Sequence, residues 1–278
     1  MKKIIVNFCP TGMVPTRKLT PNVPVSPKEI IEQTHQAYET GITIVHIHAR
    51  NDDETPTYRA SIYRDIFEGV RRYCPDLVIC GSTSGRNWPE FEKRSEVIEL
   101  MPDMCSLTLS SLNFVKQASL NAPDMIIRLA EKMSEYGVVP ELECFDLGMI
   151  NYGKYLIGKK VIEGPYYWNL LFGNIAGFQA NLSQMGAAIM EVPEDHYLGV
   201  AGIGADQLRA NAVAIAMGYG VRVGLEDNIW WDRDRKHPTS NNELIKRIHR
   251  LIEIHDAAVM PPAEFGQLGF YNKKKQGN

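Results

Sequence analysis

Ile42-Thr43-Ile44-Val45-His46-Ile47-His48 is an apolar run with histidines at two alternate positions near its end. The run predicts a buried β-strand. Because side chains two residues apart on a strand share a face, both imidazoles are expected to point the same way at its carboxyl end. A helix pattern precedes the run, with Ser26 as N-cap, Pro27 in the first turn and Glu29 completing a capping box. Gly41 separates the predicted helix from the predicted strand.

The same alternation of a short apolar run and a helical pattern extends along the chain. The predicted strands are 3–8, 42–48, 77–80, 104–107, 138–144, 166–172, 197–200 and 221–225. The predicted helices are 27–40, 59–73, 89–100, 123–136, 147–156, 182–190, 205–217 and 241–255. Eight such pairs without a dividing linker predict a single α/β domain over residues 1–278, a (β/α)8 TIM barrel with a short C-terminal extension. An open doubly wound sheet usually carries a glycine-rich turn after its first strand, and Cys9-Pro10-Thr11-Gly12-Met13 lacks that pattern.

Composition excludes several classes of protein. The 278 residues carry a net charge of −3 and no basic stripe with interleaved aromatics, which argues against a nucleic-acid partner. The five cysteines are an odd number without C-x-x-C spacing, as expected in a reduced cytoplasmic compartment. No apolar run reaches membrane-spanning length, and the N-terminus lacks the apolar region of a signal peptide. A cytoplasmic protein without a membrane partner is therefore expected.

Polar side chains gather where the predicted strands end, which is where barrel enzymes place their chemistry. The residues at these ends include His46, His48, Ser82, Ser106, Thr108, Glu141, Glu143, Gly202, Gly204, Arg222, Glu226, Asp227 and Asn228. Glu226 could complete a site with His46 and His48, and zinc held by two histidines and a glutamate keeps a position open for substrate. The alternatives are a hydrogen-bonded histidine pair and a helix-capping or solvated Glu-Asp-Asn turn.

Three other strand-end features each allow two interpretations. Arg222 lies within an apolar run, so its guanidinium needs an anionic partner, either a structural carboxylate or an anionic substrate. Glu141 and Glu143 could act as an acid or base near a metal, or form a salt bridge with an arginine. Gly202-Ile203-Gly204 could hold a phosphate at the start of the following helix.

Several stretches together resemble the β-keto acid cleavage enzyme family. They are 12–16, 24–30, 44–50 (Ile-Val-His-Ile-His-Ala-Arg), 106–114, 202–204 and 222–228 (Arg-Val-Gly-Leu-Glu-Asp-Asn). The resemblance implies a zinc-dependent TIM barrel, commonly a homotetramer, that converts a β-keto acid and acetyl-CoA into acetoacetate and a new acyl-CoA. It also implies that zinc stabilises an enolate as a Lewis acid.

The resemblance assigns roles to individual residues. His46, His48 and Glu226 would hold zinc, and Asp227 would act as general base. The residues expected to assist are Arg222, Glu143 and Ser82, and those expected to contact substrate are Ser106, Thr108, Met13, Asn228, Gly202 and Gly204.

One departure from the family bears on the substrate. In the enzyme acting on 3-keto-5-aminohexanoate, an acidic residue after the first strand meets the amino group, whereas residues 9–17 here contain no carboxylate. We therefore expect a neutral or apolar β-keto acid beside Met13 and Val14, or an acidic one that uses Arg17.

Two alternative functions are compatible with part of these sequence features. A metal-dependent TIM-barrel hydrolase or aldolase would use the same metal site without CoA. A non-catalytic protein could bind an acyl ligand, but binding alone does not need Asp227, Arg222 and Glu143 beside a metal.

Overall fold

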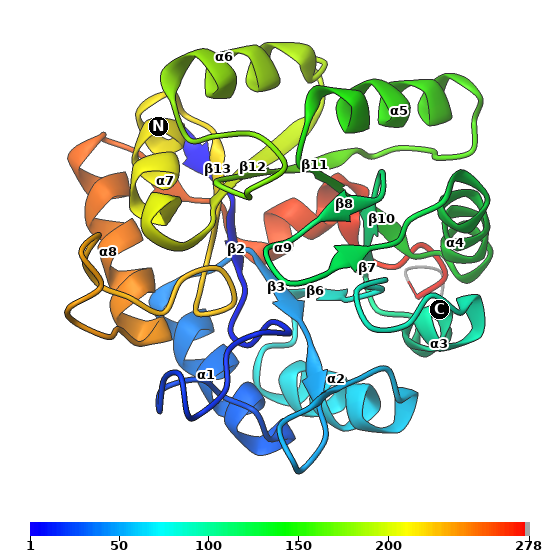
Figure 1. Cartoon of the computed structure of the whole chain (residues 1–278), viewed down its shortest axis with the longest axis horizontal. Coiled ribbons are helices and arrows are strands. Elements are labelled where there is room, and N and C mark those ends of the chain that lie inside the picture. The colour runs from blue at the N-terminus through cyan, green and yellow to red at the C-terminus, as the bar shows by residue number, and fades with distance from the viewer. Residues whose placement is uncertain (276–278) are drawn as a thin grey trace.

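The structure, a computed structural model, describes residues 1–275 and contains a closed barrel of eight parallel strands. In order around the barrel they are β2 (Val6–Phe8), β3 (Ile44–Ile47), β6 (Val78–Gly81), β7 (Met104–Thr108), β10 (Val139–Cys144), β11 (Tyr167–Phe172), β12 (Tyr197–Gly202) and β13 (Gly220–Val223). β13 pairs with β2, which closes the sheet. The predicted (β/α)8 barrel is confirmed, and Figure 1 shows the helices surrounding the strands.

The surrounding helices follow the sequence pattern closely. They are α1 (Pro27–Thr40), α2 (Ala60–Tyr73), α3 (Phe91–Ser95) with the 3-10 helix η1 (Glu96–Leu100), α4 (Pro123–Tyr136), α5 (Leu147–Gly158), α6 (Leu182–Glu191), α7 (Gln207–Ala216) after the 3-10 turn η2 (Gly204–Asp206), and α8 (Asn241–Ile254). At the start of α1, the Ser26 side chain accepts from the Glu29 amide and the Glu29 side chain accepts from the Ser26 amide, as the capping box predicts. No helix within residues 1–275 is long and apolar enough to cross a membrane.

The first predicted strand, 3–8, is divided into two strands. Only β2 belongs to the barrel, while β1 (Lys3–Ile4) pairs with β14 (Ala258–Val259) in a separate two-stranded sheet. After β14, the Met260 amide donates to the Ile4 carbonyl at 2.8 Å. The C-terminal extension is therefore joined to the beginning of the chain.

The C-terminal extension closes the amino end of the barrel. α9 (Pro262–Phe265) and the π-helical turn η3 (Gly266–Phe270) bring the rings of Phe265 and Phe270 into parallel contact, with centroids 4.1 Å apart. Both rings are fully buried against Tyr167 and other inward-facing strand residues. Burial of two phenylalanines contributes about 3–6 kcal/mol of hydrophobic stabilisation. Residues 276–278 of the predicted extension lie outside the described part of the chain.

Short hairpins cover the carboxyl end of the barrel. One consists of β4 (Ala49–Arg50) and β5 (Pro56–Thr57), and the other of β8 (Leu112–Asn113) and β9 (Ala118–Ser119). Figure 1 shows the β8–β9 hairpin in front of the barrel strands. The Arg50 guanidinium donates to the carbonyls of Gly12, at 2.9 Å, and Pro15, at 3.0 Å, which fixes the loop after β2 at the same end.

Candidate active site

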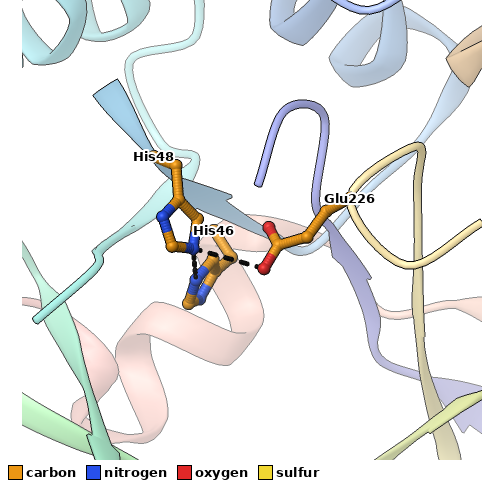
Figure 2. Close-up of side chains that lie close together, drawn as sticks. All are labelled: His46, His48 and Glu226. Carbon is orange, nitrogen blue, oxygen red and sulfur yellow. Dashed lines mark hydrogen bonds and ion pairs between the residues drawn. The ribbon is translucent and has the colours of Figure 1, made fainter. Parts of the chain in front are cut away.

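The two histidines and Glu226 meet at the carboxyl end of the barrel (Figure 2). His46 lies on β3 and His48 directly follows it, and their Nε2 atoms are 3.2 Å apart. Glu226 reaches them from the segment after β13, with Oε1 3.2 Å from His48 Nε2. Gly12 permits this approach, because a Cβ atom there would lie 2.4 Å from Glu226 Cγ and its φ of +63° also favours glycine.

The donor set of these three residues suits a divalent metal ion. One ligand atom from each lies within 4.8 Å of the others. In tetrahedral zinc sites with bonds of about 2.0–2.1 Å, two histidine nitrogens lie about 3.3 Å apart, close to the spacing found here. At this distance the two Nε2 atoms can share a proton in a hydrogen bond or bind one cation through both lone pairs. Glu226 Oε2 is also buried without a hydrogen-bond partner, which leaves an oxygen for a ligand.

Glu141 on β10 orients His46 from below the site. Its Oε2 lies 2.7 Å from His46 Nδ1, and its Oε1 accepts from the side-chain amides of Asn7 and Asn169 at 2.6 and 3.0 Å. Burial opposes the charge of Glu141, but the adjacent His46 imidazole lowers the pKa of this carboxyl to about 2. An ionised Glu141 fixes the proton of His46 on Nδ1, so that Nε2 is free to bind a metal.

Arg222 on β13 joins three carboxylates and is itself almost fully buried. Its Nε lies 2.9 Å from Asp227 Oδ2, its Nη2 2.5 Å from Glu226 Oε1, and its Nη1 3.3 Å from Glu143 Oε1. The anionic partners required by the sequence are therefore structural carboxylates. Burial raises the pKa of the Asp227 carboxyl; Arg222 opposes this rise and Glu226 adds to it. Asp227 thus combines a fixed orientation with more basicity than an ordinary aspartate.

Most of these groups line a cavity of about 650 Å³ that opens at the carboxyl end of the barrel, whereas His46 and Glu141 are almost fully buried and are not part of its lining. The predicted site residues on its wall are Met13, His48, Ser82, Thr108, Glu143, Gly204, Arg222, Glu226, Asp227 and Asn228. Arg86 and Phe114 also line it, and the sequence analysis did not predict them. They lie in loops, where no periodic pattern indicates which side chains face a cavity.

Comparison with known proteins identifies the family. The sequence matches the β-keto acid cleavage enzyme family over residues 3–268. The chain belongs to this family. It is 32% identical over 265 residues to the 3-keto-5-aminohexanoate cleavage enzyme of Acetoanaerobium sticklandii, covering 95% of this chain and 97% of that protein. It is 33% identical to the 3-oxoadipate:acetyl-CoA acetyltransferase of Cupriavidus necator, covering 94% of this chain and 92% of that protein.

Solved structures support the fold of this β-keto acid cleavage family member. The apo structure of ObcA superposes with a TM-score of 0.78 at 17% identity, covering 91% of this chain and 66% of the ObcA chain. The phospho-2-dehydro-3-deoxyheptonate aldolase of Thermotoga maritima superposes with a TM-score of 0.57 at 12% identity, covering 93% of this chain and 71% of that one. Both likenesses concern the barrel architecture.

Ser106 and Gly202 of this family member are not among the residues that line the cavity. The Ser106 hydroxyl accepts from the Thr83 amide at 3.1 Å, and the Ser106 carbonyl accepts from the Thr83 hydroxyl at 2.5 Å. A Cβ atom at Gly202 would lie 2.4 Å from the Asp206 carbonyl oxygen, so this glycine serves close packing. Contact of these two residues with substrate stays a prediction.

Gly204 and Arg17 of this family member also have partners within the protein. The Gly204 amide donates to the Asp227 carbonyl at 2.7 Å, so it positions Asp227 and is not free for a phosphate. Arg17 Nη2 lies 2.8 Å from both carboxylate oxygens of Glu29, and Nη1 lies 3.2 Å from Glu54. Arg17 does not line the cavity, so binding of an acidic substrate by Arg17 stays a prediction.

Glu141→Gln is expected to weaken metal binding about 10- to 100-fold, the usual effect of removing a carboxylate behind a ligating histidine. The uncharged amide does not enforce the His46 tautomer. Zinc affinity, measured by competition with a chromophoric chelator, tests this prediction. Glu131→Gln changes an exposed glutamate on α4 and provides the control. Equal zinc affinity in both variants would refute the orienting role.

Proposed function

We propose that this protein is an acetyl-CoA-dependent β-keto acid cleavage enzyme, which yields acetoacetate and a new acyl-CoA. The observation that carries this proposal is Asp227, a buried and oriented carboxylate on the cavity wall beside the cluster of His46, His48 and Glu226, whose donor atoms suit a metal. A metal-dependent hydrolase or aldolase would share the cluster, but family membership favours the reaction with a thioester.

We propose zinc as the resident ion, with His46, His48 and Glu226 as its ligands. Imidazole and carboxylate donors with an open position are typical of catalytic zinc. When bound, zinc supplies Lewis-acid stabilisation of the negative charge that develops on the keto acid.

Asp227 moves the proton in this scheme. Its carboxylate removes a proton from C2 of the β-keto acid, and the resulting carbon nucleophile attacks the acetyl-CoA thioester with loss of CoA thiolate. The thiolate then adds to the original keto carbon, and the carbon–carbon bond breaks to leave an acyl-CoA and the acetoacetate carbanion. Asp227 returns its proton to that carbanion. A raised pKa suits this double role as base and acid.

Other residues position the reactants. Arg222 holds Asp227 through Nε and Nη2, which orients the carboxylate before substrate enters. The Ser82 hydroxyl lies on the cavity wall, where we propose that it donates to the substrate carboxylate. At the cavity mouth, the exposed cations Lys116 and Arg235 suit the phosphates of the coenzyme. The homotetramer and the cytoplasmic location stay predictions.

A panel of β-keto acids tests the proposed function. Each acid is incubated with the zinc-loaded protein and acetyl-CoA, and the CoA esters are identified by mass spectrometry. We expect a new acyl-CoA and acetoacetate in equal amounts, with no turnover when acetyl-CoA is omitted. Continued turnover without acetyl-CoA would favour the hydrolase or aldolase, and binding without any turnover would favour a non-catalytic protein.

A further inference from the structure

Arg86 lies on the cavity wall in a fixed position. It follows the Ser82 loop after β6, and its guanidinium carbon is 3.6 Å from the ring centroid of Phe114 at the tip of the β8–β9 hairpin. Its amide donates to the Ser84 hydroxyl at 3.3 Å, and its carbonyl accepts from the Gln117 side chain at 3.2 Å. Both backbone bonds and the aromatic ring therefore hold the side chain at the cavity.

Arg86 forms no ion pair within residues 1–275, and Glu226, Glu143 and Asp227 stabilise its charge only at longer range. Its Nε atom is buried without a hydrogen-bond partner. The carboxylates that face the cavity, Glu143, Glu226 and Asp227, are bound to Arg222 instead. A partly desolvated guanidinium is stabilised by an anion that accepts its N–H groups. The structure thus provides an anion-binding group without supplying the anion.

The arrangement of the cavity indicates which anion this is. The end of the keto acid that reacts belongs beside His48, Glu226 and Asp227. The coenzyme phosphates have the exposed cations Lys116 and Arg235 at the mouth. Arg86 is buried more deeply than these two cations, under the ring of Phe114. The partner that remains for Arg86 is a group at the end of the keto acid that projects away from the reacting carbons.

The opposite substrate charge is disfavoured. An ammonium group would need a carboxylate of unbalanced charge in the cavity, whereas Arg222 and a bound divalent ion together offset the three that line it. The loop after β2 contributes Met13 and Val14 to the wall and contains no acidic residue. An ammonium near Arg86 would also be repelled.

We infer that Arg86 binds a carboxylate at the far end of the keto acid, and that the preferred substrates are β-keto dicarboxylic acids. This inference rests on the proposed function and specifies its substrate class. Arg86 would act as a specificity-determining residue, since its planar N–H groups match a carboxylate in a bidentate geometry.

Two substrates of equal chain length test the inference. 3-Oxoadipate carries the distal carboxylate, and 3-oxohexanoate ends in a methyl group. With the zinc-loaded protein we expect kcat/KM about 10- to 100-fold higher for 3-oxoadipate, the range of one charged hydrogen-bonded contact. Arg86→Gln should remove this preference mainly through the KM of the keto acid. Arg86→Lys should retain part of it, because the charge remains without the bidentate geometry.

Arg128→Gln is the matched control. It removes another guanidinium stacked on a phenylalanine, 3.9 Å from the Phe91 ring centroid, at a position outside the cavity lining. This variant should keep the wild-type preference. Calorimetric titration of both acids into the zinc-loaded wild type and Arg86→Gln gives a readout that does not need turnover.

Several outcomes would overturn the inference. Equal losses for both acids in Arg86→Gln would assign Arg86 to the carboxylate common to all β-keto acids or to packing. A raised KM for acetyl-CoA alone would assign it to the coenzyme. A wild-type protein that prefers 3-oxohexanoate would also contradict it while leaving the proposed function intact. Absence of acetyl-CoA-dependent turnover with any acid would instead refute the proposed function, and calorimetry would then decide the inference.

Discussion

His48→Ala is expected to reduce acetyl-CoA-dependent turnover about 1,000-fold or more. Removing this imidazole leaves His46 and Glu226 as an incomplete set of protein ligands. Lewis-acid stabilisation is worth several kcal/mol, and each 1.36 kcal/mol corresponds to a tenfold change in rate. Turnover and zinc content, measured on the same sample, test the prediction. Wild-type zinc content with wild-type turnover would show that His48 is not a ligand.

The thermal stability of His48→Ala gives a second test of whether His48 binds zinc. Zinc that binds only the folded state raises the melting temperature, and this rise should be lost in His48→Ala. Without zinc, the variant should be about 1–3 kcal/mol less stable than wild type, because the contact between His48 Nε2 and Glu226 Oε1 at 3.2 Å is lost. A large loss of stability in the metal-free variant would indicate that the His48 ring serves mainly for packing.

His249→Ala provides the control for these measurements. The His249 side chain bonds to the Gly41 carbonyl at 2.7 Å, outside the cavity lining. Its removal should lower the melting temperature with and without zinc by the same amount. The zinc-dependent rise in melting temperature should persist, which separates loss of a metal ligand from loss of an ordinary histidine contact.

The clustering of His46, His48 and Glu226 was predictable because periodicity and fold place these residues. The strand pattern of 42–48 puts His46 and His48 on one face, and the barrel architecture brings the end of β13 to the same rim. The sequence left Glu141 open between an acid or base near a metal and a salt bridge with an arginine, and did not indicate that it orients His46. Only the packed barrel shows that its carboxylate lies 2.7 Å from His46 Nδ1.

The features of the structure that the sequence did not predict arise from contacts between distant parts of the chain. The division of 3–8 into two strands depends on β14, whose residues pair with β1 across about the whole length of the sequence. Ser106 has the strand phase of a site residue, and its hydroxyl accepts a hydrogen bond from the amide of Thr83 on the neighbouring loop. Arg86 faces the cavity because the β8–β9 hairpin brings Phe114 over it. None of these three contacts, β1 with β14, Ser106 with Thr83 or Arg86 with Phe114, leaves a periodic signal in the sequence.

Asp227→Asn is expected to lower kcat about 100- to 10,000-fold, the usual contribution of a positioned general base. Asparagine is nearly isosteric, and its side-chain oxygen can accept from Arg222, so the site should keep its shape. It cannot take up the C2 proton at neutral pH. The zinc content and the KM of the keto acid should therefore change little. Asp65→Asn, at an exposed position on α2, is the control.

Deuterium exchange at C2 of the keto acid isolates the proton-transfer step. In D2O without acetyl-CoA, the wild-type protein should accelerate this exchange above the rate without enzyme, and Asp227→Asn should not. Glu143 is another carboxylate on the wall that Arg222 binds, and burial and the nearby Glu141 raise its pKa as well. Exchange that survives in Asp227→Asn but is lost in Glu143→Gln would transfer the role of base to Glu143. Loss in both variants would instead show that Arg222 must hold both carboxylates for either one to act.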